Sequence, residues 1–77
     1  MNDDFWNELY KDVPVEIQEG EKTIRMMIEE TGKNFMHTTM QLQINRWIKE
    51  GKLIYVGRRI LPDGKIAKAY KAVNPHN

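Results

Sequence analysis

Residues 38–54, TTMQLQINRWIKEGKLI, join a helical pattern directly to the start of a strand. Apolar residues recur at helical spacing through this stretch and just before it, and they form one stripe: Met36, Met40, Ile44, Trp47 and Ile48. Such a stripe is typical of a helix that packs on a core. Gly51 stands where a helix commonly ends, and apolar residues follow soon after it. The sequence therefore predicts a helix over about 38–50 and then a β-strand.

A hairpin is expected to follow this helix. Residues 52–60 (KLIYVGRRI) and 65–73 (KIAKAYKAV) flank the sequence LPDG. A proline presets φ at the first corner of a turn, and a glycine accepts the left-handed conformation at its end. We expect a type I turn followed by a bulge. Tyr55 and Tyr70 are expected to face each other across the two strands.

The N-terminal segment predicts an amphipathic helix over about 4–12 that ends before Pro14. Its apolar residues form two neighbouring rows: Phe5, Leu9 and Val13 in one, Trp6 and Tyr10 in the other. Beyond it, residues 13–17 alternate between apolar and polar types, which fits either a short strand or a continuation of the helix. We expect Trp6 and Trp47 to belong to the core, because so small a domain has few large apolar residues.

Residues 20–31 predict another helix, and Gly32 is expected to stop it. A short connection then leads to the helix that contains residues 38–50. Thr38 or Thr39 is a candidate N-cap of that helix, because threonine side chains commonly accept hydrogen bonds at this position. The order is thus helix, strand, helix, helix and hairpin.

The composition limits the classes of function. The chain has 77 residues, no cysteine and two histidines, so we expect one domain over 1–73, a flexible tail over 74–77, and neither a disulfide nor a zinc site. No stretch approaches the roughly 20 apolar residues that cross a bilayer, and no export signal is evident, so we expect no membrane contact and a cytoplasmic location. No nucleotide-binding loop or catalytic triad is present, so we expect neither an enzyme nor a cofactor.

Charge is divided between the two halves of the chain. Residues 1–30 contain nine acids and three bases, a net charge of −6, whereas residues 31–77 contain nine bases and two acids, a net charge of +7. This asymmetry favours a polyanionic partner for the basic half. Two solvated faces that attract each other within the fold are the alternative interpretation.

The order of elements resembles the winged helix-turn-helix family of DNA-binding domains. The resemblance rests on TIRMMIEETG (23–32), on TTMQLQINRWIKEGKLI and on the hairpin, and it extends over about residues 4–73. It implies a small α+β fold of three helices with a C-terminal β-hairpin wing. A short strand after the first helix is possible in this fold if residues 13–17 do not continue the helix. The resemblance also implies binding to double-stranded DNA, with the third helix in the major groove and the wing on the phosphate backbone.

The residue types on the polar side of the third helix suit a DNA duplex, because hydroxyl, amide and guanidinium groups bond to base edges and a leucine can contact a thymine methyl. By the resemblance, the base-contacting candidates are Thr38, Thr39, Gln41, Leu42, Asn45 and Arg46. The candidates for backbone contacts are Lys33, Lys49, Arg58, Arg59, Lys65 and Lys68. Each has a structural alternative: threonines cap helices, polar helix faces are solvated, and lysines protect exposed strand edges.

The sequence thus predicts a sequence-specific DNA-binding protein, a small transcriptional regulator, that uses neither a cofactor nor a metal. The alternative is a protein-interaction module with the same fold, whose acidic first 30 residues would meet a basic partner. A homodimer through the N-terminal helix is a further expectation, and the residues for it are Phe5, Trp6, Leu9 and Tyr10.

Overall fold

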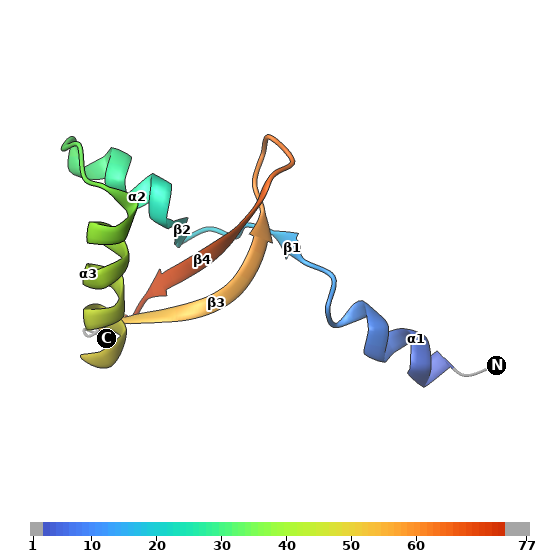
Figure 1. The fold of residues 1–77 in the computed structure, drawn as a ribbon. Helices are drawn as coiled ribbons and strands as arrows, with labels where there is room; N and C mark the ends of the chain where they lie inside the picture. The colour runs from blue at the N-terminus through green and yellow to red at the C-terminus, as the bar shows by residue number, and fades with distance from the viewer. Residues whose placement is uncertain (1–2, 74–77) are drawn as a thin grey trace.

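The computed structural model describes residues 3–73 as a mixed α+β domain with three helices and one four-stranded sheet (Figure 1). The helices are α1 (Asp3–Tyr10), α2 (Ile24–Thr31) and α3 (His37–Lys49). The strands are β1 (Val15–Glu16), β2 (Glu21–Thr23), β3 (Leu53–Ile60) and β4 (Ile66–Ala72). The tail expected over 74–77 lies outside the described residues.

The strand order is β1-β3-β4-β2, which corrects the expectation of a simple C-terminal hairpin. The antiparallel pair β3·β4 is the predicted hairpin, but it forms the centre of the sheet. Strand β1 pairs in parallel with the end of β3, where Val15 lies opposite Arg59. Strand β2 pairs antiparallel with β4, where Glu21 lies opposite Lys71. These short segments satisfy backbone groups that a free hairpin would leave open at both edges.

The turn of the hairpin is closed by three hydrogen bonds. The Gly64 N–H donates to the Leu61 carbonyl at 2.8 Å, and the Leu61 N–H donates to the Lys65 carbonyl at 2.7 Å. The Asp63 side chain accepts from the Lys65 N–H at 2.9 Å. Gly64 has φ 89°, the left-handed conformation that the sequence predicted for this glycine.

A bulge between Tyr55 and Gly57 decides which arginine faces α3. Tyr55 lies opposite Tyr70, whereas Arg58 lies opposite Lys68 three residues further along β3. Because side chains alternate along a strand, a regular ladder would place Arg59 on the face of Tyr55. The extra residue reverses that alternation, so Arg58 lies on the face of Tyr70 that contacts α3.

We expect Gly57→Ala to lower the free energy of unfolding by on the order of 1–3 kcal/mol, because Gly57 has φ 109°, which other residues rarely adopt. A β-carbon there would lie 3.4 Å from the Arg59 Nη1, which is an ordinary contact, so the strain would come from the backbone conformation. Chemical denaturation followed by circular dichroism measures the change. An unchanged midpoint would show that the bulge does not need a glycine.

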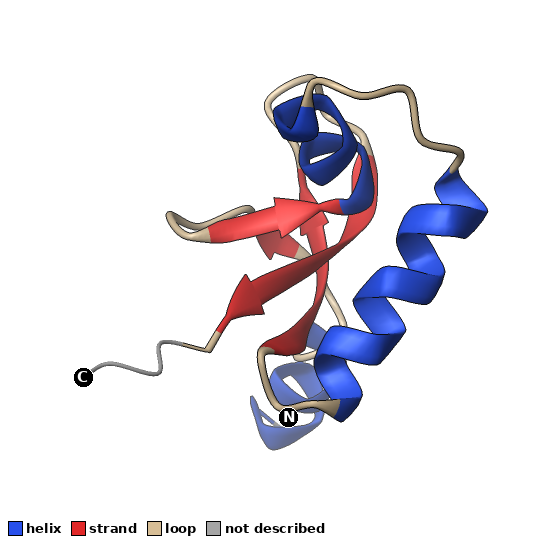
Figure 2. Cartoon of the chain, turned by 90° about the vertical axis from the view of Figure 1, so that its left-hand side faces the viewer, coloured by secondary structure: helices blue, strands red, loops and turns tan. Residues whose placement is uncertain are grey.

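The core lies between α3 and the sheet, with α2 beside them (Figure 2). Its buried members are Met40 and Ile44 of α3 with Leu53 and Tyr70 of the hairpin. The partly buried Ile24, Met27, Ile28 and Trp47 pack against this cluster. The predicted stripe of α3 is therefore confirmed at its centre. Met36 is 70 % exposed and lies outside the core, because it precedes the first turn of the helix.

Two helix starts differ from the sequence-based expectation. Helix α2 begins at Ile24 and not near residue 20, because Thr23 ends β2 and its Oγ1 accepts the Met26 N–H at 3.3 Å. Helix α3 begins at His37, and its N-cap is Met36 without a side-chain hydrogen bond. The expectation that Thr38 or Thr39 caps the helix is therefore wrong. Both lie within the first turn, where their hydroxyls do not serve as the cap.

Both predicted helix stops are confirmed. Gly32 adopts φ 70° after α2, and its N–H donates to the Glu29 carbonyl. Gly51 adopts φ 77° after α3, and its N–H donates to the Ile48 carbonyl at 3.0 Å. Left-handed glycines at this position satisfy helix carbonyls that would otherwise lack donors.

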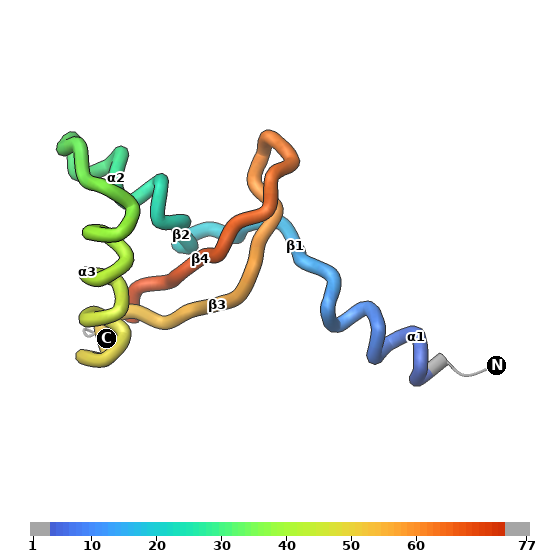
Figure 3. The backbone as a smooth tube through the Cα atoms, in the orientation of Figure 1, coloured from blue at the N-terminus to red at the C-terminus, as the bar shows by residue number. Residues whose placement is uncertain are grey.

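Helix α1 projects from the sheet at the end opposite to α2 and α3 (Figure 3). Its apolar side chains remain exposed, with exposed fractions of 57 % for Phe5, 44 % for Trp6, 43 % for Leu9 and 61 % for Tyr10. The expectation that Trp6 belongs to the core is therefore wrong. The residues between Tyr10 and β1 lead away from the domain, so neither apolar row of α1 reaches the core.

Candidate nucleic-acid interface

A groove of about 240 Å³ separates the polar side of α3 from the hairpin. Its lining comes from three elements: Gln41, Asn45 and Ile48 of α3, Tyr55 of β3, and Lys68 and Tyr70 of β4. The groove exists because the core residues of α3 lie on the adjoining side of the helix and hold it against the same face of the sheet. Two base-contacting candidates and one hairpin cation therefore share one surface.

Two amides on α3 are joined by a hydrogen bond. The Gln41 Nε2 donates to the Asn45 Oδ1 at 3.0 Å, one turn apart on the helix. This bond orients the Asn45 amide and leaves its NH₂ group free to donate. The Asn45 oxygen retains a second lone pair, so the amide can still both accept from and donate to one base.

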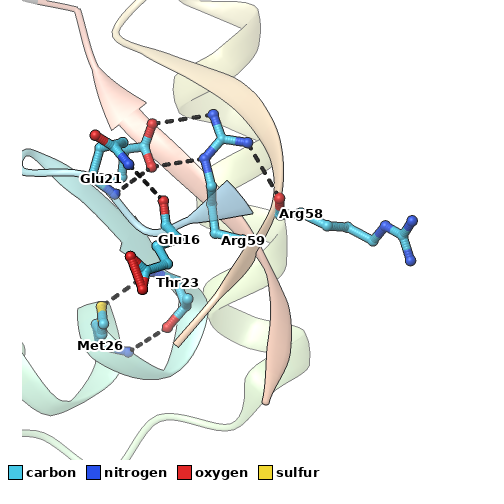
Figure 4. Close-up of polar contacts among 7 residues, drawn as sticks. Glu16, Glu21, Thr23, Met26, Arg58 and Arg59 are labelled. Carbon is cyan, nitrogen blue, oxygen red and sulfur yellow. Dashed lines mark hydrogen bonds and ion pairs between the residues drawn. The ribbon is translucent and has the colours of Figure 1, made fainter. Parts of the chain in front are cut away.

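Arg58 and Lys68 form a cationic pair across the hairpin. They lie directly opposite each other, and both are exposed on the face of the sheet that carries Tyr70. The Arg58 side chain extends away from the sheet into solvent (Figure 4). Like charges opposite each other on paired strands destabilise a hairpin, so this arrangement suits a surface that meets an anion.

Arg59 points to the other face and makes an internal ion pair with Glu21 of β2 (Figure 4). Its Nε donates to the Glu21 Oε1 at 2.9 Å and its Nη2 to the Oε2 at 3.3 Å. The Glu21 side chain is 7 % exposed and that of Arg59 is 18 % exposed. Arg59 therefore ties β2 to β3, and it does not extend the cationic surface of Arg58 and Lys68.

The hydrogen bonds from Arg59, with a further one from the Gln18 N–H, hold the pKa of Glu21 below its ordinary value of 4.5. A carboxyl whose pKa is lower in the folded state stabilises the fold when it is ionised. Its contribution to the free energy of unfolding is complete above the pKa of the unfolded chain, near 4.5, and disappears as the pH falls through the lower pKa of the folded state.

We expect the free energy of unfolding of the wild type to fall more steeply below about pH 4.5 than that of Glu21→Gln. The variant is also expected to be less stable at neutral pH, because Arg59 then lacks its anion. Denaturant titrations at a series of pH values measure both effects, and Glu19→Gln, an exposed acid nearby, is the control. Parallel pH profiles for the wild type and Glu21→Gln would contradict this role.

The remaining candidates of α3 divide between two sides of the helix. Thr38, Leu42, Arg46 and Lys49 are exposed, and Leu42 is 70 % exposed although it is apolar. Thr39 lines a different groove, on the side of α3 that faces the end of α2. The structure therefore brings Gln41 and Asn45 to the hairpin but separates Thr39 from them.

Two further cation candidates, Lys33 and Lys65, do not line this groove. Lys33 is in the connection between α2 and α3, and Lys65 follows the hairpin turn. Neither lysine forms an ion pair within residues 3–73. The ion pairs found there involve Lys11, Lys22, Arg25, Lys52 and Arg59. The acidic helix α1 lies at the far end of the sheet from α3 (Figure 1), so it does not cover the α3 groove.

Sequence reasoning did not identify Tyr55 as part of the groove or Glu21 as the partner of Arg59. Tyr55 is 49 % exposed, and its ring lies 5.5 Å from that of Tyr70 between centroids, as the predicted cross-strand pairing required. The predicted pairing of Tyr55 with Tyr70 was the feature of the sequence that could have placed Tyr55 beside α3. No local signal marks Glu21, because its partner is 38 residues away in the sequence.

No group of three or more His, Cys, Asp or Glu side chains within residues 3–73 is arranged to hold a metal ion. None of the helices in that range is long and apolar enough to cross a bilayer. Comparison with models of protein families, with curated proteins and with solved structures finds no match to this chain.

Proposed function

We propose that this protein binds double-stranded DNA in a sequence-specific manner and acts as a small transcriptional regulator. In this proposal the domain is a winged helix without enzymatic activity. Helix α3 enters the major groove, and the hairpin β3·β4 lies along the phosphate backbone. Phosphate contacts hold the protein in register, and side chains of α3 distinguish the bases.

The observation that supports this proposal most strongly is the groove shared by α3 and the hairpin. It places the Gln41–Asn45 amide pair on the same surface as Lys68, which has Arg58 opposite it. Amide groups that can donate and accept together suit a base edge, and neighbouring cations suit the phosphates beside it. Neither cation has an ion-pair partner within residues 3–73.

A salt titration of duplex binding tests the proposal. Fluorescence anisotropy with a labelled random duplex should give an affinity that falls steeply with salt, with a slope of about −0.9 for each phosphate neutralised. Four or five contacts would give a slope of about −4. Absence of binding at about 50 mM salt, where backbone contacts are strongest, would contradict the proposal.

Asn45→Ala is expected to relax the preference for one base position of a selected site. A good bidentate contact contributes about 1–3 kcal/mol of discrimination, and affinity for random duplex should change little. Lys49→Ala is the contrasting variant, because loss of a phosphate contact weakens all sequences alike. Selection from a randomised duplex pool measures the preference, and an unchanged preference for Asn45→Ala would refute the docking of α3.

The alternative, an interaction module that does not bind DNA, is favoured by the exposed apolar side of α1. In this alternative the acidic residues 1–30 would meet a basic partner. Four of those acids already form ion pairs within the domain: Glu8, Glu21, Glu29 and Glu30. The salt titration separates the two functions, because an interaction module has no reason to bind a random duplex.

A further inference from the structure

Helix α1 presents an apolar surface that its own domain does not cover. Trp6, Leu9 and Tyr10 lie on one side of α1, with the Trp6 and Tyr10 rings stacked at 6.0 Å between centroids. Each of these side chains is more than two-fifths exposed. Exposed apolar patches of this kind mark interaction sites in soluble proteins.

A second apolar surface lies at the opposite end of the molecule. A groove of about 300 Å³ between the end of α2 and α3 is lined by Thr31, Phe35, Thr39, Met40, Gln43 and Trp47. Phe35 is 36 % exposed and Trp47 is partly buried, so aromatic rings line it. This groove lies on the other side of α3 from the one that contains Asn45.

We propose that the protein forms a dimer in which each copy inserts α1 into the Phe35–Trp47 groove of the other copy. The occupant of the groove is thus a second copy of this chain. The contact is reciprocal and is made twice, once on each side of a two-fold axis. It does not depend on DNA binding.

The chain cannot cover its own groove with its own helix. Residue Val15 is fixed in the sheet beside Arg59, and residues 11–14, which join it to α1, span at most about 14 Å when fully extended. The pair β3·β4 lies between β1 and the α2–α3 end of the molecule (Figure 1). Docking within one copy would require β1 to leave the sheet.

The segments that carry the two apolar surfaces differ in charge, which favours their approach although the acids of α1 lie on its polar side. The polar side of α1 includes Asp4 and Glu8. Lys33 lies in the sequence between two residues of the groove, and Arg46 between two others, and neither forms an ion pair within residues 3–73. An acidic amphipathic helix also does not suit an anionic lipid surface, which attracts helices rich in lysine and arginine.

The area supports exchange over direct pairing of two α1 helices. A large aromatic side chain buries about 150–250 Å², so the exposed parts of the α1 side chains amount to roughly 300–400 Å². Pairing α1 with α1 would bury about twice that, which is less than the roughly 1,200 Å² of a stable interface. Reciprocal docking buries both α1 helices and also the two grooves that receive them, so the total buried area reaches about 1,200 Å².

Cross-linking tests the geometry, because the chain has no cysteine of its own. Tyr10→Cys and Gln43→Cys copies are mixed and treated with a short bis-maleimide, and the products are separated by denaturing electrophoresis. We expect a covalent dimer in the mixture and little in either variant alone. Glu8→Cys, on the polar side of α1, replaces Tyr10→Cys as the control and should cross-link much less. Cross-linking of Tyr10→Cys to itself would overturn the proposal in favour of α1–α1 pairing.

Sedimentation tests whether the dimer exists. The wild type is expected at about twice its monomer mass of 9.1 kDa at a few hundred micromolar, and Leu9→Asp and Phe35→Asp are each expected as monomers. Circular dichroism of both variants checks that they fold, and Leu9→Asp alters no core residue. A monomeric wild type, or a Leu9→Asp variant that remains dimeric, would refute the exchange and leave the DNA proposal unaffected.

Discussion

Replacing Arg58 and Lys68 together by alanine is expected to reduce affinity for random duplex about sixtyfold at about 0.1 M salt. Each lost phosphate contact removes about 0.9 from the salt slope, which corresponds to about eightfold at that salt concentration. The two side chains face each other on the α3 side of the hairpin, so they should contact the same stretch of backbone. The slope should therefore become shallower by nearly two.

A charge-matched control separates this surface from a general effect of net charge. Arg25→Ala and Lys11→Ala together also remove two positive charges, but both residues form ion pairs in the acidic half of the chain. We expect that double variant to bind almost as well as the wild type. An equal loss of affinity in both double variants would show that the Arg58–Lys68 pair has no special place in binding.

Arg58 and Arg59 are also expected to differ when each is replaced singly. Arg58→Ala should weaken DNA binding with little change in the free energy of unfolding, because its side chain is exposed. Arg59→Ala should mainly destabilise the fold, because it leaves the Glu21 carboxylate without its partner inside the sheet. The two neighbours are thus expected to differ because side chains alternate along β3, and the bulge determines which of them faces α3.

Ile44→Ala is expected to lower the free energy of unfolding by about 2–5 kcal/mol. Ile44 is fully buried at the centre of the cluster that joins α3 to the hairpin. A domain of this size has about 3–5 kcal/mol of net stability, so the variant should be largely unfolded at room temperature. Thermal unfolding followed by circular dichroism measures the loss.

Leu42→Ala is the matched control for this substitution. Leu42 lies on the same helix but is 70 % exposed, so its replacement should change stability by no more than about 0.5 kcal/mol. If both variants lost similar stability, the side of α3 that faces the core would have been assigned incorrectly. The grooves on either side of the helix would then be misplaced as well.

The sequence predicted the elements whose signals are local. The apolar stripe of α3, the stops at Gly32 and Gly51 and the hairpin turn at Gly64 all depend on residues close together in the chain. The Tyr55–Tyr70 pair was also predictable, because the turn fixes which residues of the two strands face each other. From those features the sequence predicted that the helix leads directly into the hairpin.

The features that were missed depend on contacts between distant segments. Strand β2 occupies residues that were predicted to begin a helix, because pairing with the edge of β4 and the Thr23 cap outweigh the helical preference of residues 20–23. The exposure of Trp6 could not be predicted, because the apolar pattern of an amphipathic helix does not indicate which surface its apolar side packs against. The bulge at Gly57 likewise follows from the sheet and not from the local pattern, although it determines which arginine faces α3.

A chemical-shift titration of the ¹⁵N-labelled protein with a short duplex tests most directly whether α3 and the hairpin act as one DNA-binding surface. We predict that the backbone amides of Asn45 and Arg58 shift together, with the side-chain amides of Gln41 and Asn45, in a single binding event, while the amides of α1 remain unchanged. Shifts confined to α1, or shifts of α3 without the hairpin, would contradict the account.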